Sequence, residues 1–455
     1  MKTKNYRIPR HIIKEFKHKR IANKILCKAP FVSMSIGLDG RVSPCCYTQI
    51  NDKLTGDAFF PIQSLSEIWN GDMFSTYRKM INKNALPNSC NICRDKLFLK
   101  EFDTVKINEY NYLEIQKKYP SLIEISVDNT CNLECVMCSS VNSSKIAMSR
   151  GVKSINKIDT DLLFTQLKEF LPFVREIIFT GGEPFLSRFY FNVWKEIIKK
   201  NPSCKITLNT NCSVLTDEAK EIIEKGIFEF NVSLDSISKE TYEHIRKNAN
   251  FETTFNNFNY LVDYSIRKNV PISVPVCPLI LNYKEIPDII KFCNRYNAYI
   301  VFVHVFSAYN VALSAADEEL LLDALAIYKQ IVLPNKSNAE KQNALQFSGL
   351  ISDVAEWRVK ALQRKKYVVS ISTHINNCEF NTKFYNLKSS FDVDIASNLD
   401  EVFNLLPDYY RTPEFISALS KYSTTTIANY LKEIPNIELA EYFQMIFNQF
   451  VDQEY

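Results

Sequence analysis

Six short apolar runs rich in β-forming residues alternate with amphipathic stretches between residues 122 and 306, and this alternation restricts the fold more than any other feature of the chain. The runs cover residues 122–129, 176–180, 205–211, 228–234, 272–279 and 299–306. Strands that alternate with helices form parallel βα units, and right-handed crossovers curl such units into a barrel or an open doubly wound sheet. In both arrangements ligands bind at the carboxyl ends of the strands. The residues that follow each run are therefore the first candidates for function.

The charge balance excludes a disordered chain, a polybasic binder and an acidic tail protein as descriptions of all 455 residues. Hydrophobic residues make up 46% of the chain, and 55 Lys and Arg against 51 Asp and Glu give a net charge of only +4. No run approaches the roughly 20 consecutive apolar residues of a membrane helix, and the N-terminus lacks the apolar stretch of a secretion signal. We expect a cytoplasmic protein with no membrane partner.

The first 30 residues are an exception to this balance. They hold ten Lys and Arg against Glu15 alone, a formal charge of +9. Such a segment could contact an acidic partner, a membrane surface or a nucleic acid, although a solvated basic helix is the commoner explanation. Nothing else in the sequence favours RNA as a substrate, so we do not expect a nucleic acid partner.

Three cysteines in C-x3-C-x2-C spacing come directly after the first predicted strand: Cys131, Cys135 and Cys138. Thiolates this close together can bind one inorganic cluster, and a cubane bound by only three cysteines keeps one iron open for another ligand. The alternative is a tetrahedral zinc site completed by a distant residue. The chain has only five His and shows no obvious fourth ligand nearby.

The second strand ends in the only Gly-Gly pair of a chain that has just nine glycines. Gly181 stands 43 positions after Cys138, and Gly182 is followed by Glu183 and Pro184. Glycine lets a backbone approach a ligand closely, and a carboxylate can pair with an ammonium group.

Together these motifs resemble the radical S-adenosylmethionine superfamily. The resemblance implies that Cys131, Cys135 and Cys138 bind a 4Fe-4S cluster whose open iron chelates S-adenosylmethionine. It also implies that Gly181, Gly182 and Glu183 hold the amino group of that cofactor. Reductive cleavage would then release a 5′-deoxyadenosyl radical that abstracts a substrate hydrogen.

Further residues match the family pattern more loosely. Met137 could pack on the adenine or simply fill the core, and Asn209 is the position that the resemblance assigns to the ribose. Ser233, in an S-L-D segment, would meet the methionine carboxylate. Cys212 replaces the usual glycine of a T-N-G stretch, and both Cys212 and Cys277 lie near strand ends where they could touch a substrate.

A second group of cysteines precedes the predicted barrel. Asp39 and Gly40 form a turn between two apolar runs, which predicts a hairpin over residues 31–36 and 41–45, and Ser64 and Glu67 form a capping box that opens a helix. Four thiolates here could bind zinc or a four-cysteine cluster. The spacing resembles the Twitch or SPASM auxiliary-cluster unit, which implies a second 4Fe-4S cluster bound by Cys27, Cys45, Cys90 and Cys93. Cys46 is the alternative to Cys45.

We therefore predict an α/β protein: a partial (β/α)6 TIM-like barrel with an N-terminal auxiliary-cluster unit and a helical C-terminal domain. The predicted parts are a basic segment (1–26), the auxiliary unit (27–100), the barrel (120–308) and the helical domain (309–455). In the last part, Ser314 to Asp317 is expected to cap a helix. No single residue is assigned as catalytic.

The predicted function is a radical S-adenosylmethionine enzyme that takes electrons from an external donor such as flavodoxin or ferredoxin. Modification of a ribosomally made peptide is the leading expectation for its substrate. Oxidation or rearrangement of a small metabolite, such as a sugar or alcohol, is the alternative. The alternative from another class is a non-catalytic iron-sulfur or zinc protein, and an ammonium-binding carboxylate beside the three-cysteine site argues against it.

Overall fold

The computed structural model describes residues 6–18, 25–48, 59–100, 102, 105–152, 158–305, 308–372, 377–406, 410 and 412–420, with scattered residues between 424 and 447. The chain divides into two compact units. The first contains Met1–Cys131, Lys153–Asn231 and Asn256–Pro271, and the second contains Asn132–Val152, Val232–Phe255 and Ile272–Tyr455. Each unit is thus assembled from segments that lie far apart in the sequence.

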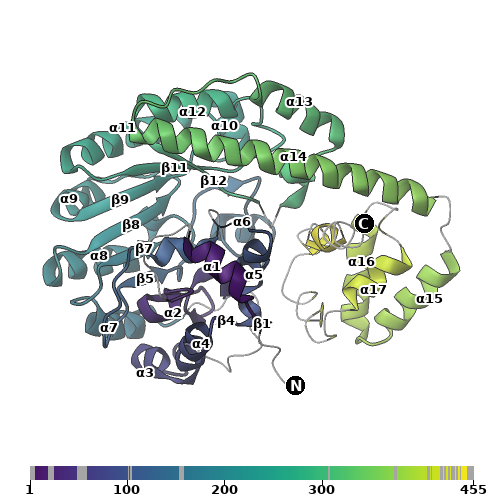
Figure 1. The fold of residues 1–455 in the computed structure, drawn as a ribbon, viewed down its shortest axis with the longest axis horizontal. Helices are drawn as coiled ribbons and strands as arrows, with labels where there is room; N and C mark the ends of the chain where they lie inside the picture. The colour runs from purple at the N-terminus through teal and green to yellow at the C-terminus, as the bar shows by residue number, and fades with distance from the viewer. Residues whose placement is uncertain are drawn as a thin grey trace. The chain divides into compact units, whose positions relative to one another are not determined.

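Neighbouring parallel strands make up the sheet of the first unit. They are β5 (Leu122–Ile125), β7 (Glu176–Phe179), β8 (Lys205–Thr210) and β9 (Ile227–Val232). β5 pairs with β7 and β7 with β8 in parallel, and β9 is hydrogen-bonded beside β8. Helices lie along one side of these strands (Figure 1), namely α7 (Thr160–Phe170), α8 (Arg188–Lys200) and α9 (Asp217–Lys225). Four of the six predicted strands are confirmed here, and with them the α/β class.

An aromatic core joins α8 to this sheet. Trp194 is fully buried, and its ring lies 5.8 Å from that of Phe179 on β7 and 5.9 Å from that of Phe228 on β9. Both contacts are edge-to-face, the arrangement that aromatic quadrupoles favour. This packing holds the strands whose carboxyl ends carry the predicted site.

The predicted hairpin is confirmed, although both of its arms are shorter than expected. β2 (Ser33–Ile36) pairs with β3 (Val42–Ser43) in antiparallel fashion around Gly40, whose φ is +79°. Residues 31 and 32 lie instead in α2 (Ala29–Val32), which has a proline in its first turn. β2 also pairs in parallel with β5, so the hairpin extends the sheet of the first unit.

Short helices complete the cysteine-rich part of the first unit. The capping box at Ser64 is confirmed, but the predicted helix is divided at Gly71 into α3 (Leu65–Asn70) and α4 (Asp72–Asn82). Next come β4 (Ala85–Leu86), which pairs with β1 (Tyr6–Arg7), and α5 (Asn91–Phe98). Part of the predicted basic segment forms α1 (Arg10–His18), whose Ile12, Ile13 and Phe16 are buried. Residues 1–5 and 19–24 of that segment lie outside the described residues.

The second unit contains the last two predicted strands, β11 (Ile272–Val276) and β12 (Tyr299–Phe302), which pair in parallel. They are shorter than the predicted runs, and Phe306 lies outside the described residues. β6 (Glu134–Cys135) pairs with β10 (Arg246–Lys247) in antiparallel fashion. The accompanying helices are α6 (Ser144–Ser149), α10 (Lys239–Ile245) and α12 (Ile286–Arg295). The residues of α11 (Phe251–Lys268) are divided between the units, with the second unit ending at Phe255 and the first resuming at Asn256.

Helices follow β12, as the sequence predicts. They are α13 (Glu318–Tyr328), α14 (Asn338–Ser372), α15 (Asn377–Lys388), α16 (Val393–Leu405) and α17 (Pro413–Leu419). The N-cap of α13 is Asp317 alone, because Ser314 lies in a preceding 3-10 turn. Phe403 centres an apolar cluster with Phe384 and Phe415. Among the described residues, no helix is long and apolar enough to cross a bilayer.

Candidate active site

The loop after β5 turns around Asp128 before it reaches Cys131. One carboxylate oxygen of Asp128 accepts hydrogen bonds from Thr130 N at 2.9 Å and Thr130 Oγ1 at 2.6 Å. The other accepts from Ser187 Oγ at 2.7 Å. An Asp that bonds the backbone two residues ahead forms an Asx turn, which fixes the local path of the chain. The hydrogen bonds of Asp128 to Thr130 and to Ser187 thus fix the conformation of the loop that carries Cys131, the first predicted cluster ligand.

The Gly-Gly segment after β7 is paired backbone to backbone with this loop. Gly182 N donates to Asp128 O at 2.9 Å, and Glu183 N donates to Thr130 O at 2.7 Å. A Cβ on Gly181 would lie 2.3 Å from Asp128 O, and one on Gly182 would lie 2.2 Å from Thr130 O. Only glycine permits this approach, and Gly181 also has a φ of +121°. The two glycines therefore join the motif after β7 to the loop that carries Cys131.

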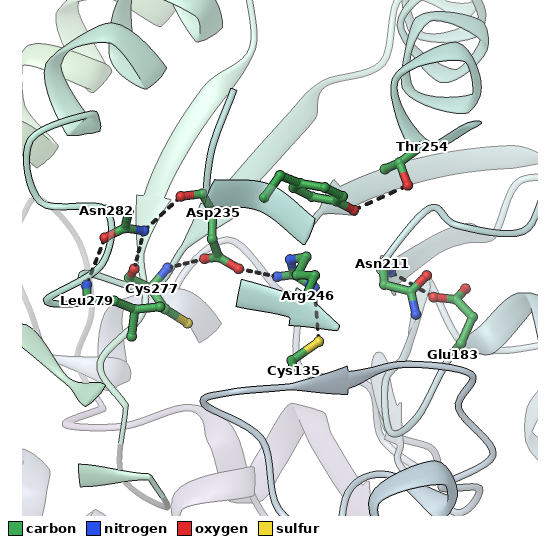
Figure 2. Close-up of polar contacts among 10 residues, drawn as sticks. Cys135, Glu183, Asn211, Asp235, Arg246, Thr254, Cys277, Leu279 and Asn282 are labelled. Atoms are coloured by element: carbon green, nitrogen blue, oxygen red, sulfur yellow. Dashed lines mark hydrogen bonds and ion pairs between the residues drawn. The ribbon is translucent and has the colours of Figure 1, made fainter. Parts of the chain in front are cut away.

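The Glu183 carboxylate is buried and bonded on both oxygens. Oε1 accepts from Phe185 N at 3.1 Å and Thr210 Oγ1 at 2.7 Å, while Oε2 accepts from Asn211 N at 2.7 Å (Figure 2). The resemblance implies that Glu183 holds the cofactor's amino group. In the structure, this carboxylate also fixes the carboxyl end of β8.

The end of β8 brings Asn211 to the first cysteine. Asn211 Nδ2 lies 3.8 Å from Cys131 Sγ, within range of a hydrogen bond to sulfur. Asn209, the residue assigned to the ribose, is half-buried and accepts from Asn231 Nδ2 at 2.6 Å. Cys212 adopts a φ of +58°, which explains why glycine suits this position. Its side chain is fully buried, and burial raises the pKa of its thiol well above the ordinary value.

The other two cysteines of the motif lie in the second unit. Cys135 is on β6 opposite Arg246 of β10, and Arg246 Nη1 lies 3.9 Å from Cys135 Sγ (Figure 2). Cys138 follows a turn in which its backbone N donates to Cys135 O at 3.0 Å. Cys131 belongs to the first unit, so the motif is divided between the units at Asn132.

A buried polar network surrounds Cys135. Asp235 Oδ2 lies 2.6 Å from Arg246 Nη2, and Asp235 Oδ1 accepts from Cys277 N at 2.7 Å. Asn282, which is fully buried, donates to Asp235 O at 2.8 Å and to Cys277 O at 3.0 Å (Figure 2). Burial raises the pKa of the Cys277 thiol well above the ordinary value, and Cys135 and Cys138 also act on it electrostatically. Three thiols therefore share one region of the second unit.

Met137 lies beside this region, whereas for Ser233 the structure shows only its place after β9 and its burial. Met137 and Cys277 both pack, partly buried, against the apolar cluster of Ile245, Leu279 and Val305. Ser233 follows β9 and is half-buried. Met137 is thus beside the predicted site and also in contact with core residues, so packing fits both of the roles expected for it.

The cysteines of the auxiliary unit gather in the first unit. Cys27 and Cys90 pack against the cluster that contains Cys93, and Cys27 also packs beside Cys45. Burial raises the pKa of Cys93 to about 12, and the Cys45 charge adds to the increase. Burial likewise raises the pKa of Cys27, on which both Cys45 and Cys93 act.

Backbone amides point at the sulfurs of this group. Ala29 donates to Cys27, residues 47 and 48 donate to Cys45, and residues 106 and 107 donate to Cys93. Hydrogen bonds to sulfur are a means by which proteins tune bound iron-sulfur clusters, so this donor set fits such a group. Within the ranges described, no three His, Cys, Asp or Glu side chains lie close enough to hold a single metal ion.

Cys46 has a different environment from Cys45. Its thiol is hydrogen-bonded to Glu124 on β5, and Lys106 lies near both groups. Burial raises the pKa of Glu124, and burial also raises that of Cys46. Glu124 and Lys106 also act electrostatically on Cys45, but Cys45 differs from Cys46 in acting on both Cys27 and Cys93.

Known protein families match both cysteine regions. The model described as the radical SAM superfamily matches residues 125–293, and the model described as an iron-sulfur cluster-binding domain, SPASM, matches residues 27–94. The fold and site thus define a class of enzymes that use iron-sulfur clusters together with S-adenosylmethionine. The chain therefore carries a radical SAM domain over residues 125–293 and, earlier in the sequence, a SPASM iron-sulfur cluster-binding domain over residues 27–94. The predictions of two 4Fe-4S clusters and of S-adenosylmethionine as cofactors are confirmed at the level of these domains.

Curated relatives are similar to only part of the chain. A probable GTP 3′,8-cyclase of Methanocaldococcus jannaschii is 28% identical over 185 residues, which is 40% of this chain and 57% of the relative. A GTP 3′,8-cyclase of Clostridium perfringens is 24% identical over 175 residues, which is 38% of this chain and 51% of the relative. The match therefore spans little more than half the length of these proteins.

Two solved structures show a weaker likeness. Native anSMEcpe with bound AdoMet is 17% identical, with 46% of this chain and 60% of that chain covered and a TM-score of 0.35. SuiB of Streptococcus suis bound to S-adenosylmethionine is 15% identical, with 52% of each chain covered and a TM-score of 0.36. Scores this low support no structural argument.

Sequence reasoning missed five residues of the networks around Glu183 and Cys135: Thr210, Asn211, Asp235, Arg246 and Asn282. The first three stand inside the T-N-C and S-L-D stretches that the sequence singles out, so their position gave a usable signal. Arg246 and Asn282 stand outside every motif, and only their burial reveals them.

Proposed function

We propose that this enzyme reductively cleaves S-adenosylmethionine and abstracts a hydrogen atom from a ribosomally made peptide. In this proposal Cys131, Cys135 and Cys138 bind the cluster that the cofactor joins, and an external donor such as flavodoxin or ferredoxin supplies the electron. When bound, the cluster and S-adenosylmethionine together supply a 5′-deoxyadenosyl radical.

One observation carries the proposal: the backbone pairing of residues 128–130 with Gly182 and Glu183. It fixes the loop that leads to Cys131 and a glycine-rich edge together at the carboxyl ends of two neighbouring parallel strands, where ligands of such sheets bind. Glu183 and Asn211 connect this edge to Cys131. In the proposal, the backbone of Gly181 and Gly182 and the carboxylate of Glu183 bind the cofactor's amino group.

The remaining proposed contacts come from neighbouring strand ends. Asn209 would bind the ribose, Ser233 the methionine carboxylate, and Met137 the adenine. Each is at least partly accessible, which a ligand contact requires. Fully buried Cys212 is not available to a substrate in this conformation.

The auxiliary cluster is assigned to Cys27, Cys45, Cys90 and Cys93. The amide donors at Cys27, Cys45 and Cys93 support this choice, and the contact of Cys46 with Glu124 supports Cys45 over Cys46. The auxiliary cluster would pass electrons or bind the substrate.

Modification of GTP is a second candidate function, because the curated relatives are named GTP 3′,8-cyclases. We favour the peptide because the chain carries a SPASM domain, and its resemblance to the auxiliary-cluster enzymes implies peptide modification as a common activity. GTP would also be a small metabolite, the alternative that the sequence leaves open.

The first test is formation of 5′-deoxyadenosine by anaerobically reconstituted protein with dithionite and S-adenosylmethionine. No 5′-deoxyadenosine would contradict the proposal, and a non-catalytic cluster protein would be the better description. Iron analysis of the wild type and of the Cys131/Cys135/Cys138→Ala variant then tests the ligands, with about eight iron expected to fall to about four. An unchanged iron content would contradict the assignment.

The substrate is tested by adding GTP or a pool of in vitro translated peptides to the same assay. A peptide that loses two hydrogens, or that gains deuterium in D2O, would support the proposal by mass spectrometry. Consumption of GTP with a matching rise in 5′-deoxyadenosine would establish the second candidate in its place.

A further inference from the structure

A buried ion pair lies beside a predicted cluster ligand in the second unit. Arg246 Nη2 and Asp235 Oδ2 are 2.6 Å apart, and the two side chains are 8% and 0% exposed. A guanidinium remains protonated in proteins, so Arg246 carries a positive charge. Arg246 Nη1 lies 3.9 Å from Cys135 Sγ. A permanent positive charge is therefore held next to this sulfur.

Backbone contacts on both sides fix the position of this charge. β10 and β6 place Arg246 directly opposite Cys135, and Val136 N donates to Ile245 O at 2.9 Å. On the other side, Asp235 is held by Cys277 N and by Asn282 Nδ2 (Figure 2). The guanidinium thus contacts the carboxylate through Nη2 at 2.6 Å and the sulfur through Nη1 at 3.9 Å.

Stability alone does not account for this arrangement. Removing two charges from water is costly, and a buried ion pair often contributes no more stability than apolar residues of the same size. Arg246 Nε is buried and has no hydrogen-bond partner among the described residues, which adds a further cost. A second role for the guanidinium would explain why a buried arginine stands at this position despite the cost.

We propose that Arg246 raises the reduction potential of the cluster bound by Cys131, Cys135 and Cys138. Reduction transfers one electron from an external reductant to the cluster, and no bond is made or broken. A fixed cation near Cys135 stabilises the added negative charge, and an N–H group directed at a cluster sulfur has the same effect. Asp235 holds the guanidinium in place and offsets part of its charge. The inference rests on the ligand assignment of the proposed function.

The test is a potentiometric titration of the reconstituted full-length protein, followed by electron paramagnetic resonance without S-adenosylmethionine. The signal of this cluster is the one that disappears in the Cys131/Cys135/Cys138→Ala variant. At the potential where the wild-type cluster is half reduced, Arg246→Gln should raise the ratio of oxidised to reduced cluster about tenfold, a shift of about 59 mV to more negative potential. Arg246→Lys, which keeps the charge, should restore most of the difference.

The neighbouring residue provides a matched control. Lys247 follows Arg246 on β10 but is exposed, so Lys247→Gln removes the same charge where water screens it and should leave the potential unchanged. Asp235→Asn removes the opposing charge and should shift the potential in the positive direction. An unchanged potential in Asp235→Asn would overturn the inference even if Arg246→Gln does not fold.

Two negative results remain distinguishable. If the triple alanine variant contains as much iron as the wild type, the ligand assignment fails and the inference fails with it. If the cluster is present but wild type and Arg246→Gln have the same midpoint potential, only the role of Arg246 is overturned. A role confined to binding S-adenosylmethionine would give this second result, because the titration omits that cofactor.

Discussion

Replacing Gly182 with alanine should destabilise the first unit and displace Cys131. The new Cβ would lie 2.2 Å from Thr130 O and 2.6 Å from Asn129 C, and both are backbone atoms with little freedom to move away. To relieve this steric clash, the backbone of Gly182 and Glu183 must move away from residues 128–130. That separation weakens the two backbone hydrogen bonds between these segments, which are 2.9 Å and 2.7 Å long.

The magnitude follows from these two effects. Overpacking in a dense interior costs about 1–3 kcal/mol. The two hydrogen bonds contribute about 1 kcal/mol each. We therefore expect Gly182→Ala to lower the free energy of unfolding by about 3–5 kcal/mol. Because Thr130 precedes Cys131 directly, we also expect less iron in the barrel cluster than in the wild type.

Urea denaturation of the apoprotein, followed by circular dichroism, measures the first effect, and iron analysis after reconstitution measures the second. Gly349→Ala is the matched control, because it lies inside α14 and no described atom beyond its chain neighbours and the nearby helix backbone lies within 4 Å of the added Cβ. That change should be neutral or should stabilise the helix by roughly 0.5–1 kcal/mol. Equal unfolding free energies for Gly182→Ala and Gly349→Ala would refute the reasoning from close backbone approach.

Three further predictions concern side chains near the two sites. Thr210→Val removes a hydroxyl that donates to Glu183 at 2.7 Å and accepts from the backbone N of Cys212. The free energy of unfolding, measured by urea denaturation, should therefore fall by about 1–3 kcal/mol. Burial raises the pKa of Cys204 and Cys293 to about 12, so at pH 8 only about one thiol in ten thousand is ionised. Iodoacetamide should therefore leave both unmodified until urea is added, as peptide mapping will show. Cys45→Ser should remove the auxiliary cluster by iron analysis while Cys46→Ser retains it, and the reverse result would exchange their assignments.

Local sequence pattern predicted the parallel strands well, because each strand is a short apolar run with polar residues at its ends. It could not predict the pairing of β2 with β5. Residues 33–36 and 122–125 are nearly ninety positions apart, and neither run carries information about the other. The division of the predicted helix at Gly71 was also missed, although glycine disfavours a helix interior and was visible in the sequence.

The cysteine spacings and the Gly-Gly-Glu segment were predictable because their chemistry is confined to a few consecutive residues. Their supporting contacts were not. Asn211 reaches Cys131 across 80 positions, and Arg246 reaches Cys135 across 111. Such partners become visible only when the strands that carry them are placed side by side.

Arg246 and Lys247 show why burial, rather than residue type, separates a functional charge from an ordinary one. The two residues are adjacent, both are basic, and neither stands in a recognised motif. On β10 their side chains point to opposite faces, since successive residues of a strand alternate. One face is against Asp235 and Cys135, and the other is in water. The same unit charge therefore acts through protein at one position and is screened at the next, so only the structure identifies which of the two can influence the cluster.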